Sequence, residues 1–450
     1  FANFEQPDLK AEFTFHVMAP SAWQVSSNGI ETQRTLLTSD PDTSRWDFAP
    51  TKAMSTYITT VLAGPYFKAE DSWSTTLGDG TRLEVPLALY CRASMAPSFD
   101  PGALFTLTRN GLDFFNELFD FSYPWGKYDQ AFVPEYNLGA MENPGLVTFT
   151  ESYVFTSRAA DSQYQGRANT LLHEMAHMWF GDLVTMKWWD DLWLNESFAE
   201  LMGFHVAEVA TRFEGGWTAF CTGRKAWGYS ADQKPTTHPI SGPVTDNRSA
   251  LMNFDGISYA KGASVLRQLM VLVGQDTFFD GVRRYLNKHA FGNTSLQDFL
   301  AAIEEASGRD LLEPDPIVDG NGSGTYSDQD DILLVQFLLQ ATAAASPASR
   351  RTSSASMSTS SNGWPIRSST CGRLRASLRA GTIMETKGHS VPTGGGSRRA
   401  STGVGVRISP TERIVMVLAP SAVALRAPRP RKRARFLCLV GFCMFGFAVL

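Results

Sequence analysis

The chain has 450 residues and a formal net charge of −5, but its charge is unevenly distributed. Residues 1–331 contain 23 basic and 43 acidic side chains, whereas residues 332–450 contain 17 basic side chains, 15 of them arginine, and only 2 acidic ones. The aromatic residues concentrate in the acidic part, which excludes a disordered chain there, and its charge argues against a nucleic-acid binder, whose phosphate contacts need clustered Lys and Arg.

Cysteine usage indicates a reducing compartment. The first 331 residues contain only Cys91 and Cys221, far apart in sequence, which is neither a disulfide framework nor a cysteine-type zinc pattern. We therefore expect a cytoplasmic protein. The chain begins at Phe1 without the basic and apolar regions of a signal peptide, so we expect that processing or truncation removed the original start.

Residues 1–90 are rich in strand patterns. Residues 11–17 alternate between apolar and polar side chains, residues 55–63 form a β-branched run typical of a buried strand, and residues 83–90 form a strand interrupted by Pro86. Because proline cannot donate to a β ladder, we predict that this last strand lies at a sheet edge.

From about residue 100 the pattern changes to helices with interspersed strands. The predicted helices cover residues 101–119, 169–180, 195–209, 258–273 and 294–305, and the predicted strands cover residues 131–134 and 146–153. Strands followed by helices in this order predict an α+β fold.

The last part of the chain has a different composition. Residues 313–329 are rich in Pro, Gly, Asp and Ser, and residues 342–410 are dominated by small residues and arginine without periodicity, so we expect the tail to be largely disordered. The apolar run at residues 436–450 is shorter than the ~20 residues of a membrane-spanning helix.

A metal-binding pattern lies within the predicted helix at residues 169–180. In His173-Glu174-Met175-Ala176-His177 the two histidines are four residues apart, so both imidazoles lie on one helix face. The alternative is a helix that carries two histidines without a metal. Glu196 follows His177 after eighteen intervening residues and supplies a third ligand, which leaves a fourth position of a catalytic zinc ion for water.

This ligand set predicts hydrolysis by a zinc-activated water, because zinc lowers the pKa of bound water to about 7. Glu174 is the expected general base, which takes the water proton and returns it to the leaving amine. Glu200 lies one helical turn beyond Glu196, where it could support a metal ligand, but we interpret it as a solvated carboxylate on the helix surface.

The segment Gly139-Ala-Met-Glu-Asn143 resembles the exopeptidase signature of the aminopeptidase N family of gluzincin zinc peptidases. Residues 4–11, 128–137 and 257–266 resemble further segments of that family, and the resemblance covers about residues 1–311. It implies a partial N-terminal antiparallel β domain at residues 1–68, a thermolysin-like zincin catalytic domain at residues 69–311, and a tail at residues 312–450 outside the family.

The resemblance also implies residue roles. His173, His177 and Glu196 would hold one zinc ion per chain. Glu174 would be the catalytic base, and Tyr259 would donate its phenol to the oxyanion. The substrate-binding residues would be Gly139, Ala140, Met141, Glu142 and Asn143, among which Glu142 would bind the free α-ammonium group and Gly139 and Ala140 would present backbone groups. Leu138 would border the pocket for the first side chain.

The implied function is zinc-dependent hydrolysis of the N-terminal peptide bond, which releases single amino acids from peptides with a free amine. Two alternatives stay open, an epoxide hydrolase of the related bifunctional branch and an inactive truncated fragment that binds zinc or peptide. Family members extend further at both ends, so the resemblance implies weaker substrate binding here. We expect a monomer that binds neither nucleic acid nor membranes.

The tail allows three interpretations. It is a disordered basic arm for nucleic acid or anionic membranes, a tail anchor that ends in residues 436–450, or a sequence read from a shifted frame. Arginine used almost without lysine favours the shifted frame, as does the loss of family resemblance near residue 311.

Overall fold

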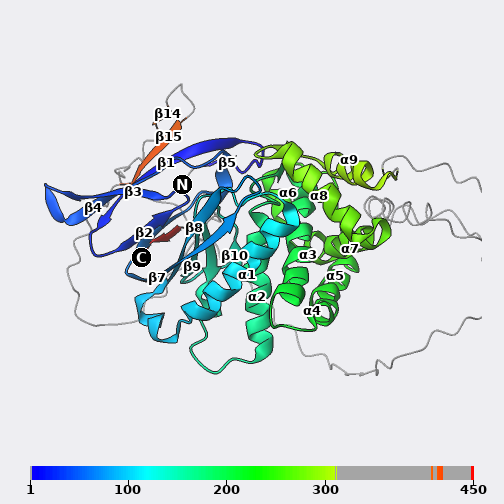
Figure 1. Ribbon diagram of the computed structural model, residues 1–450, viewed down its shortest axis with the longest axis horizontal. Helices are drawn as coiled ribbons and strands as arrows, with labels where there is room; N and C mark the ends of the chain where they lie inside the picture. The colour runs from blue at the N-terminus through cyan, green and yellow to red at the C-terminus, as the bar shows by residue number, and fades with distance from the viewer. Residues whose placement is uncertain (1–2, 310, 312–406, 409–412, 419–446, 450) are drawn as a thin grey trace, which may run out of the picture. The chain divides into compact units, whose positions relative to one another are not determined.

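The computed structural model describes residues 3–309, 311, 407–408, 413–418 and 447–449 (Figure 1). Most of residues 312–450, including most of the apolar run at residues 436–450, lies outside the described residues, so the expectations for this part stay predictions. The domain boundaries after residues 68 and 311 stay predictions. None of the helices in the described part of the chain has the length and apolar content needed to cross a bilayer.

The strands within residues 10–64 form two sheets, which three short strands from residues 407–449 also join. The larger sheet has the order β14-β15-β1-β4-β3, with β5 also paired to β1, and the smaller sheet has the order β16-β6-β2. The strands are β1 (Lys10–Pro20), β2 (Gln24–Ser27), β3 (Glu31–Leu37), β4 (Asp40–Phe48), β5 (Met54–Ser55), β6 (Val61–Gly64), β14 (Arg407–Ile408), β15 (Arg413–Leu418) and β16 (Phe447–Val449). The strand predicted at residues 11–17 is confirmed, and its alternate side chains Phe13, Phe15 and Val17 are buried.

The prediction of one strand over residues 55–63 was wrong. A short 3-10 helix, Thr56–Ile58, separates β5 from β6, although the whole run is buried as expected. Thr56 lies in that helical turn, and its hydroxyl donates to the Phe4 carbonyl at 2.7 Å. β-Branched residues therefore indicated burial correctly but did not reveal the local turn.

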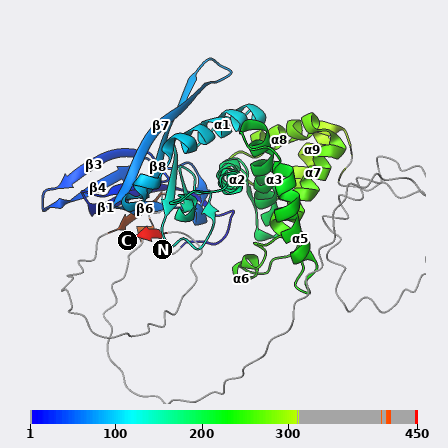
Figure 2. The ribbon, with the colours of Figure 1, turned by 90° about the horizontal axis from the view of Figure 1, so that it is seen from below.

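A mixed five-stranded sheet follows, with the order β10-β11-β9-β8-β7. Its strands are β7 (Tyr66–Thr76), β8 (Arg82–Arg92), β9 (Tyr128–Val133), β10 (Ala140–Met141) and β11 (Leu146–Thr150), and Figure 2 shows β7 and β8 as a long hairpin. The edge position predicted for residues 83–90 was wrong, because β8 lies between β7 and β9. Pro86 is tolerated because the pairing with β9 begins one residue later, at Leu87.

The helices are α1 (Pro101–Phe119), α2 (Asp161–His177), α3 (Leu192–Ala210), α4 (Gly216–Ala219), α5 (Lys225–Asp232), α6 (Asn247–Leu251), α7 (Gly262–Val273), α8 (Gln275–His289) and α9 (Leu296–Ser307). Two π-helical segments, Phe220–Arg224 and Ile257–Lys261, precede α5 and α7. A two-stranded parallel ladder joins β12 (Thr185–Met186) to β13 (Asn293–Thr294). The α+β prediction is confirmed.

An aromatic core fixes the position of α2. Trp179, just after its C-terminus, is fully buried and lies 5.6 Å from the ring of Phe115 and 5.5 Å from that of Phe119, both on α1. The Trp179 indole donates to the Phe121 carbonyl at 2.8 Å. The helix that carries the two predicted histidine ligands is thereby anchored at its C-terminal end.

Candidate metal and peptide site

The three predicted metal ligands come from two adjacent helices. His173 and His177 lie on α2 and Glu196 lies on α3, and the two helices run side by side in Figures 1 and 2. Gly203 of α3 permits their close approach, since a Cβ atom there would lie 2.9 Å from the Asn169 carbonyl oxygen and 3.3 Å from the His173 backbone nitrogen.

The ligand atoms of the three residues converge. The Nε2 atoms of His173 and His177 lie 3.1 Å apart, and Glu196 Oε2 lies 3.4 Å from each of them. This Oε2 is buried and makes no hydrogen bond within the described residues. The three ligand atoms all lie within 4.8 Å of one another. They are two imidazole nitrogens and a carboxylate oxygen without a hydrogen bond, which is the donor set of a catalytic zinc ion.

The hydrogen bonding of His177 supports this assignment. Its Nδ1 lies 2.8 Å from the Phe180 carbonyl oxygen, which can only accept, so Nδ1 carries a proton and Nε2 is the ring nitrogen left for a metal. Although burial alone would raise the pKa of Glu196, the two imidazoles lower it to about 2. The residues present therefore fit a zinc ion.

Glu142 and Glu174 lie next to this ligand set. Carboxylate oxygens of both residues and a ring nitrogen of His177 lie within 4.8 Å of one another. Burial raises the pKa of Glu174 well above its ordinary value, and Glu142 adds to this effect. Burial also raises the pKa of Glu142, although His177 opposes it. A cationic group that enters between these carboxylates would relieve their repulsion.

The predicted signature at residues 139–143 contributes an edge strand to the site. Ala140 and Met141 make up β10, which pairs only with β11 among the described strands and so leaves one edge for an extended peptide. Gly139 accepts from the Thr150 amide at 3.0 Å. Asn143 differs from the other predicted residues because its side chain does not line the cavity, and its amide donates to the Thr148 hydroxyl at 3.1 Å.

Tyr259 reaches the same site from the second π-helical segment. Its ring lies parallel to the His173 imidazole, with 5.9 Å between centroids and 11° between planes. Burial raises the pKa of its phenol well above the ordinary value, as does the negative charge of Glu196. The hydroxyl therefore stays protonated and can donate a hydrogen bond.

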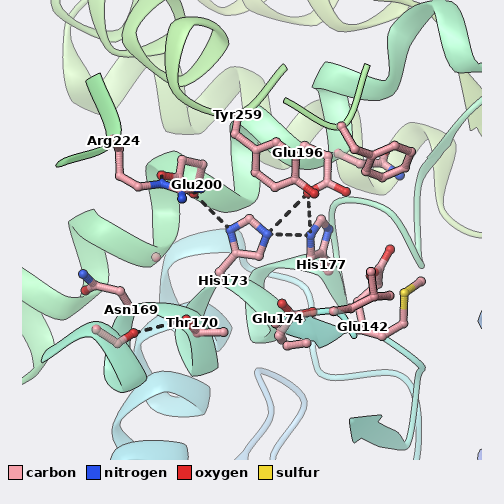
Figure 3. A pocket seen from close by; sticks show the side chains of 18 of the residues that line it. Glu142, Asn169, Thr170, His173, Glu174, His177, Glu196, Glu200, Arg224 and Tyr259 are labelled. Atoms are coloured by element: carbon pink, nitrogen blue, oxygen red, sulfur yellow. Dashed lines mark hydrogen bonds and ion pairs between the residues drawn. The ribbon is translucent and has the colours of Figure 1, made fainter. Parts of the chain in front are cut away.

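The prediction of a solvated Glu200 was wrong. This carboxylate is buried and pairs with Arg224, whose Nη2 lies 2.9 Å from Glu200 Oε2, and it faces His173 (Figure 3). Sequence reasoning also missed Arg224 and Tyr57, which both line the cavity. The spacing of Glu196 and Glu200 on one helix face was the signal that could have placed Glu200 at the site.

One cavity of about 790 Å³ joins these groups. Figure 3 shows Glu142 and Arg224 on opposite sides of the two imidazoles. Leu138 borders the cavity, as the resemblance implied, and so do aromatic residues that were not predicted, among them Tyr57, Trp189 and Phe254. A peptide has room to extend across the metal ligands from Glu142 toward Arg224.

Together, the helical His-Glu-x-x-His ligands and the glutamate on the following helix define a gluzincin-type zinc peptidase site. Residues 104–314 match the Peptidase family M1 domain, and this part of the chain belongs to that family. It is 51% identical over 313 residues to aminopeptidase N of Streptomyces lividans, an alignment that covers 69% of this chain and 35% of that protein.

Two more distant relatives give similar coverage. The chain is 33% identical over 316 residues to aminopeptidase 2 of Candida albicans, covering 70% of this chain and 33% of the relative. It is also 33% identical over 319 residues to glutamyl aminopeptidase of Bos taurus, covering 70% of this chain and 32% of that relative. The chain thus spans about a third of the length of these relatives.

Proposed function

We propose that this chain is a zinc aminopeptidase, which hydrolyses the first peptide bond of peptides with a free N-terminal amine. The observation that carries the proposal is the position of Glu142, whose carboxylate lies beside the general base Glu174 and the metal ligand His177. A buried carboxylate at that place binds an ammonium group next to the scissile bond. Its family membership and the aminopeptidase names of its relatives support the same activity.

Binding at Glu142 would limit cleavage to the chain end. An acetylated N-terminus or an internal amide carries no positive charge, so it would leave the buried carboxylates without a partner. The edge of β10 that faces away from β11 would hold the substrate backbone in an extended form, with Leu138 near the first side chain. This arrangement presents the first carbonyl carbon to the three metal ligands.

A zinc ion held by His173, His177 and Glu196 would act as a Lewis acid and would lower the pKa of a water that it binds. Glu174 accepts a proton from the attacking water and delivers it to the leaving nitrogen. The water oxygen bonds to the carbonyl carbon, and the carbon–nitrogen bond breaks. Tyr259 donates its phenol proton as a hydrogen bond to the developing oxyanion. The products are one free amino acid and a peptide that is one residue shorter.

The test uses the full chain loaded with one equivalent of zinc and a short peptide supplied with a free or an acetylated N-terminus. Mass spectrometry should show stepwise loss of single residues from the free peptide only, and a chelator should stop the loss. Zinc binding without turnover would favour the inactive fragment over the enzyme. Cleavage inside the acetylated peptide would exclude the proposed specificity. The cytoplasmic location and the monomeric state stay predictions.

A further inference from the structure

An ion pair between the buried carboxylate of Glu200 and the partly exposed guanidinium of Arg224 lies beside the metal ligands, on the side away from Glu142. Arg224 contacts both carboxylate oxygens of Glu200 through Nε and Nη2, which is the bidentate geometry of a strong charge-assisted pair. The Glu200 side chain is only 5% exposed. Without Arg224, a lone carboxylate would be buried next to the metal site, which is energetically costly.

The free face of this carboxylate is directed at a metal ligand. Glu200 Oε2 lies 3.7 Å from His173 Nδ1, while Nε2 of the same ring faces His177. That distance is slightly longer than a hydrogen bond. A metal-binding histidine usually donates its other ring N–H to a carboxylate or carbonyl, which fixes the ring orientation and raises its basicity. Glu200 occupies the position of such an acceptor.

Arg224 also contacts the group that stabilises the oxyanion in the proposed function. Its guanidinium carbon lies 5.8 Å from the centroid of the Tyr259 ring and 4.6 Å from that of Trp227, and the Trp227 and Tyr259 rings are themselves 5.8 Å apart. Arg224 therefore links a metal ligand, through Glu200, to the phenol that stacks on the same imidazole.

The backbone is built to bring these two side chains together. Arg224 ends one π-helical segment and Tyr259 lies in the middle of the other. Such segments are rare in proteins as a whole, and those that occur often lie at functional sites. The two regions pack through glycines, since a Cβ atom on Gly256 would lie 2.8 Å from the Trp227 carbonyl oxygen, and one on Gly228 would lie 3.2 Å from the Gly256 carbonyl oxygen.

We propose that Arg224 is a positioning residue, which holds Glu200 against His173 and so fixes the orientation of this zinc ligand and of the adjacent Tyr259. This proposal rests on the proposed zinc site and deepens the proposed function. Arg224 acts through Glu200 and through the Tyr259 ring. Its loss should loosen metal binding and slow the chemical step more than it weakens substrate binding.

The experiment compares the zinc-loaded parent with Arg224→Gln, Arg224→Lys and Glu200→Gln. Arg284→Gln is the matched control, because Arg284 also pairs with two carboxylates but at the surface, far from the ligands in sequence. The readouts are the rate of zinc loss to excess chelator and the visible spectrum of the cobalt-substituted protein, both independent of turnover, together with kcat and KM.

Arg224→Gln and Glu200→Gln should weaken zinc binding about 10- to 100-fold, with Arg224→Lys in between and Arg284→Gln unchanged. The cobalt spectrum should change in the first two variants, and kcat should fall more than KM rises. Zinc loss and cobalt spectra identical to the parent in folded Arg224→Gln and Glu200→Gln would overturn the proposal. If Arg224→Gln does not fold, Arg224→Lys and Glu200→Gln decide by the same criteria.

The metal readouts also separate this proposal from the proposed function. A parent that binds zinc tightly but hydrolyses nothing contradicts the aminopeptidase activity alone, and zinc release from the variants still decides the role of Arg224. A parent that binds no zinc contradicts both.

Discussion

The side-chain amide of Asn28 donates to the carbonyl oxygen of Pro144 at 2.9 Å and thereby ties the N-terminal β region to the loop that carries Glu142. The same amide nitrogen donates to the Ile58 carbonyl at 3.0 Å, and Asn28 Oδ1 accepts from the Thr60 amide at 2.8 Å. Because Asn28 is buried, each of these hydrogen bonds satisfies a polar group that water cannot reach. The position of the predicted amine-binding residue therefore depends on a residue more than 100 positions away.

Replacing Asn28 with Ala should leave three buried backbone groups without partners. The expected loss of unfolding free energy is about 2–4 kcal/mol, measured by urea denaturation. KM for a free-amine substrate should rise more than kcat falls, because the loop of Glu142 loses its support. Thr32→Val removes an exposed hydroxyl that donates to a backbone carbonyl and should change neither quantity. Equal stability of the two variants would contradict the role of Asn28.

Gly145 is constrained by its backbone and by its neighbour. Its φ is +76°, and a Cβ atom would lie 2.2 Å from the Asn28 carbonyl oxygen. Gly145→Ala should therefore lower the melting temperature. Gly215 has the same φ but nothing within 4 Å, so Gly215→Ala measures the backbone strain alone, about 1 kcal/mol. If both variants lose the same free energy of unfolding, the close approach of Gly145 to Asn28 does not contribute to stability.

Substitutions of Glu174 and His173 should distinguish loss of catalysis from loss of metal binding. Glu174→Gln removes the general base and should lower kcat by about 10²- to 10⁴-fold, while the zinc content measured by atomic absorption stays at one per chain. His173→Ala should lose most of the zinc as well as the activity. Loss of zinc from Glu174→Gln would show that Glu174 is a ligand and not a base.

Lys10 predicts a pH dependence of stability. Its Nζ donates to the Gly292 carbonyl at 2.9 Å and to the Asp182 carbonyl at 3.3 Å. Burial lowers the pKa of Lys10 to about 8, and the nearby Asp182 opposes this shift. The unfolded chain, with an ordinary lysine pKa of about 10.4, therefore binds more protons above pH 8, so folding should gain stability as the pH rises from about 8 to 10.

The measurement is urea unfolding of the parent and of Lys10→Met at several pH values over this range. The free energy of unfolding of the parent should rise relative to that of Lys10→Met as the pH increases, because the variant shares every other titrating group. Parallel pH profiles for the two proteins would contradict a lowered pKa in the folded state.

The sequence predicted elements whose signals are local. The helix at residues 101–119 was placed correctly, because Asp100 caps its first turn, Pro101 opens it, and its apolar side chains recur on one face. The signal for the two histidine ligands was also local, since the spacing of His173 and His177 within one helix brings their imidazoles together. Helix α8 was missed although Gly274 precedes it and Phe278, Val282 and Tyr285 share a buried face.

Interactions between distant segments could not be predicted. Arg224 lies 24 residues after Glu200, and only the tertiary packing of a π-helical segment brings its guanidinium to that carboxylate. The central position of β8 depends on its parallel pairing with β9, which begins beyond Pro86. Asn143 belongs to the predicted signature, yet the fold turns its side chain toward Thr148.

The central claim is that Glu142 selects a free amine at a zinc peptidase site. It is tested most directly by kcat/KM for an alanine anilide and for its N-acetyl form, measured with the zinc-loaded parent and with Glu142→Gln. The parent should strongly prefer the free amine, and Glu142→Gln should lose most of this preference while it retains zinc. An equal preference in both proteins, or faster turnover of the acetylated substrate by the parent, would contradict the claim.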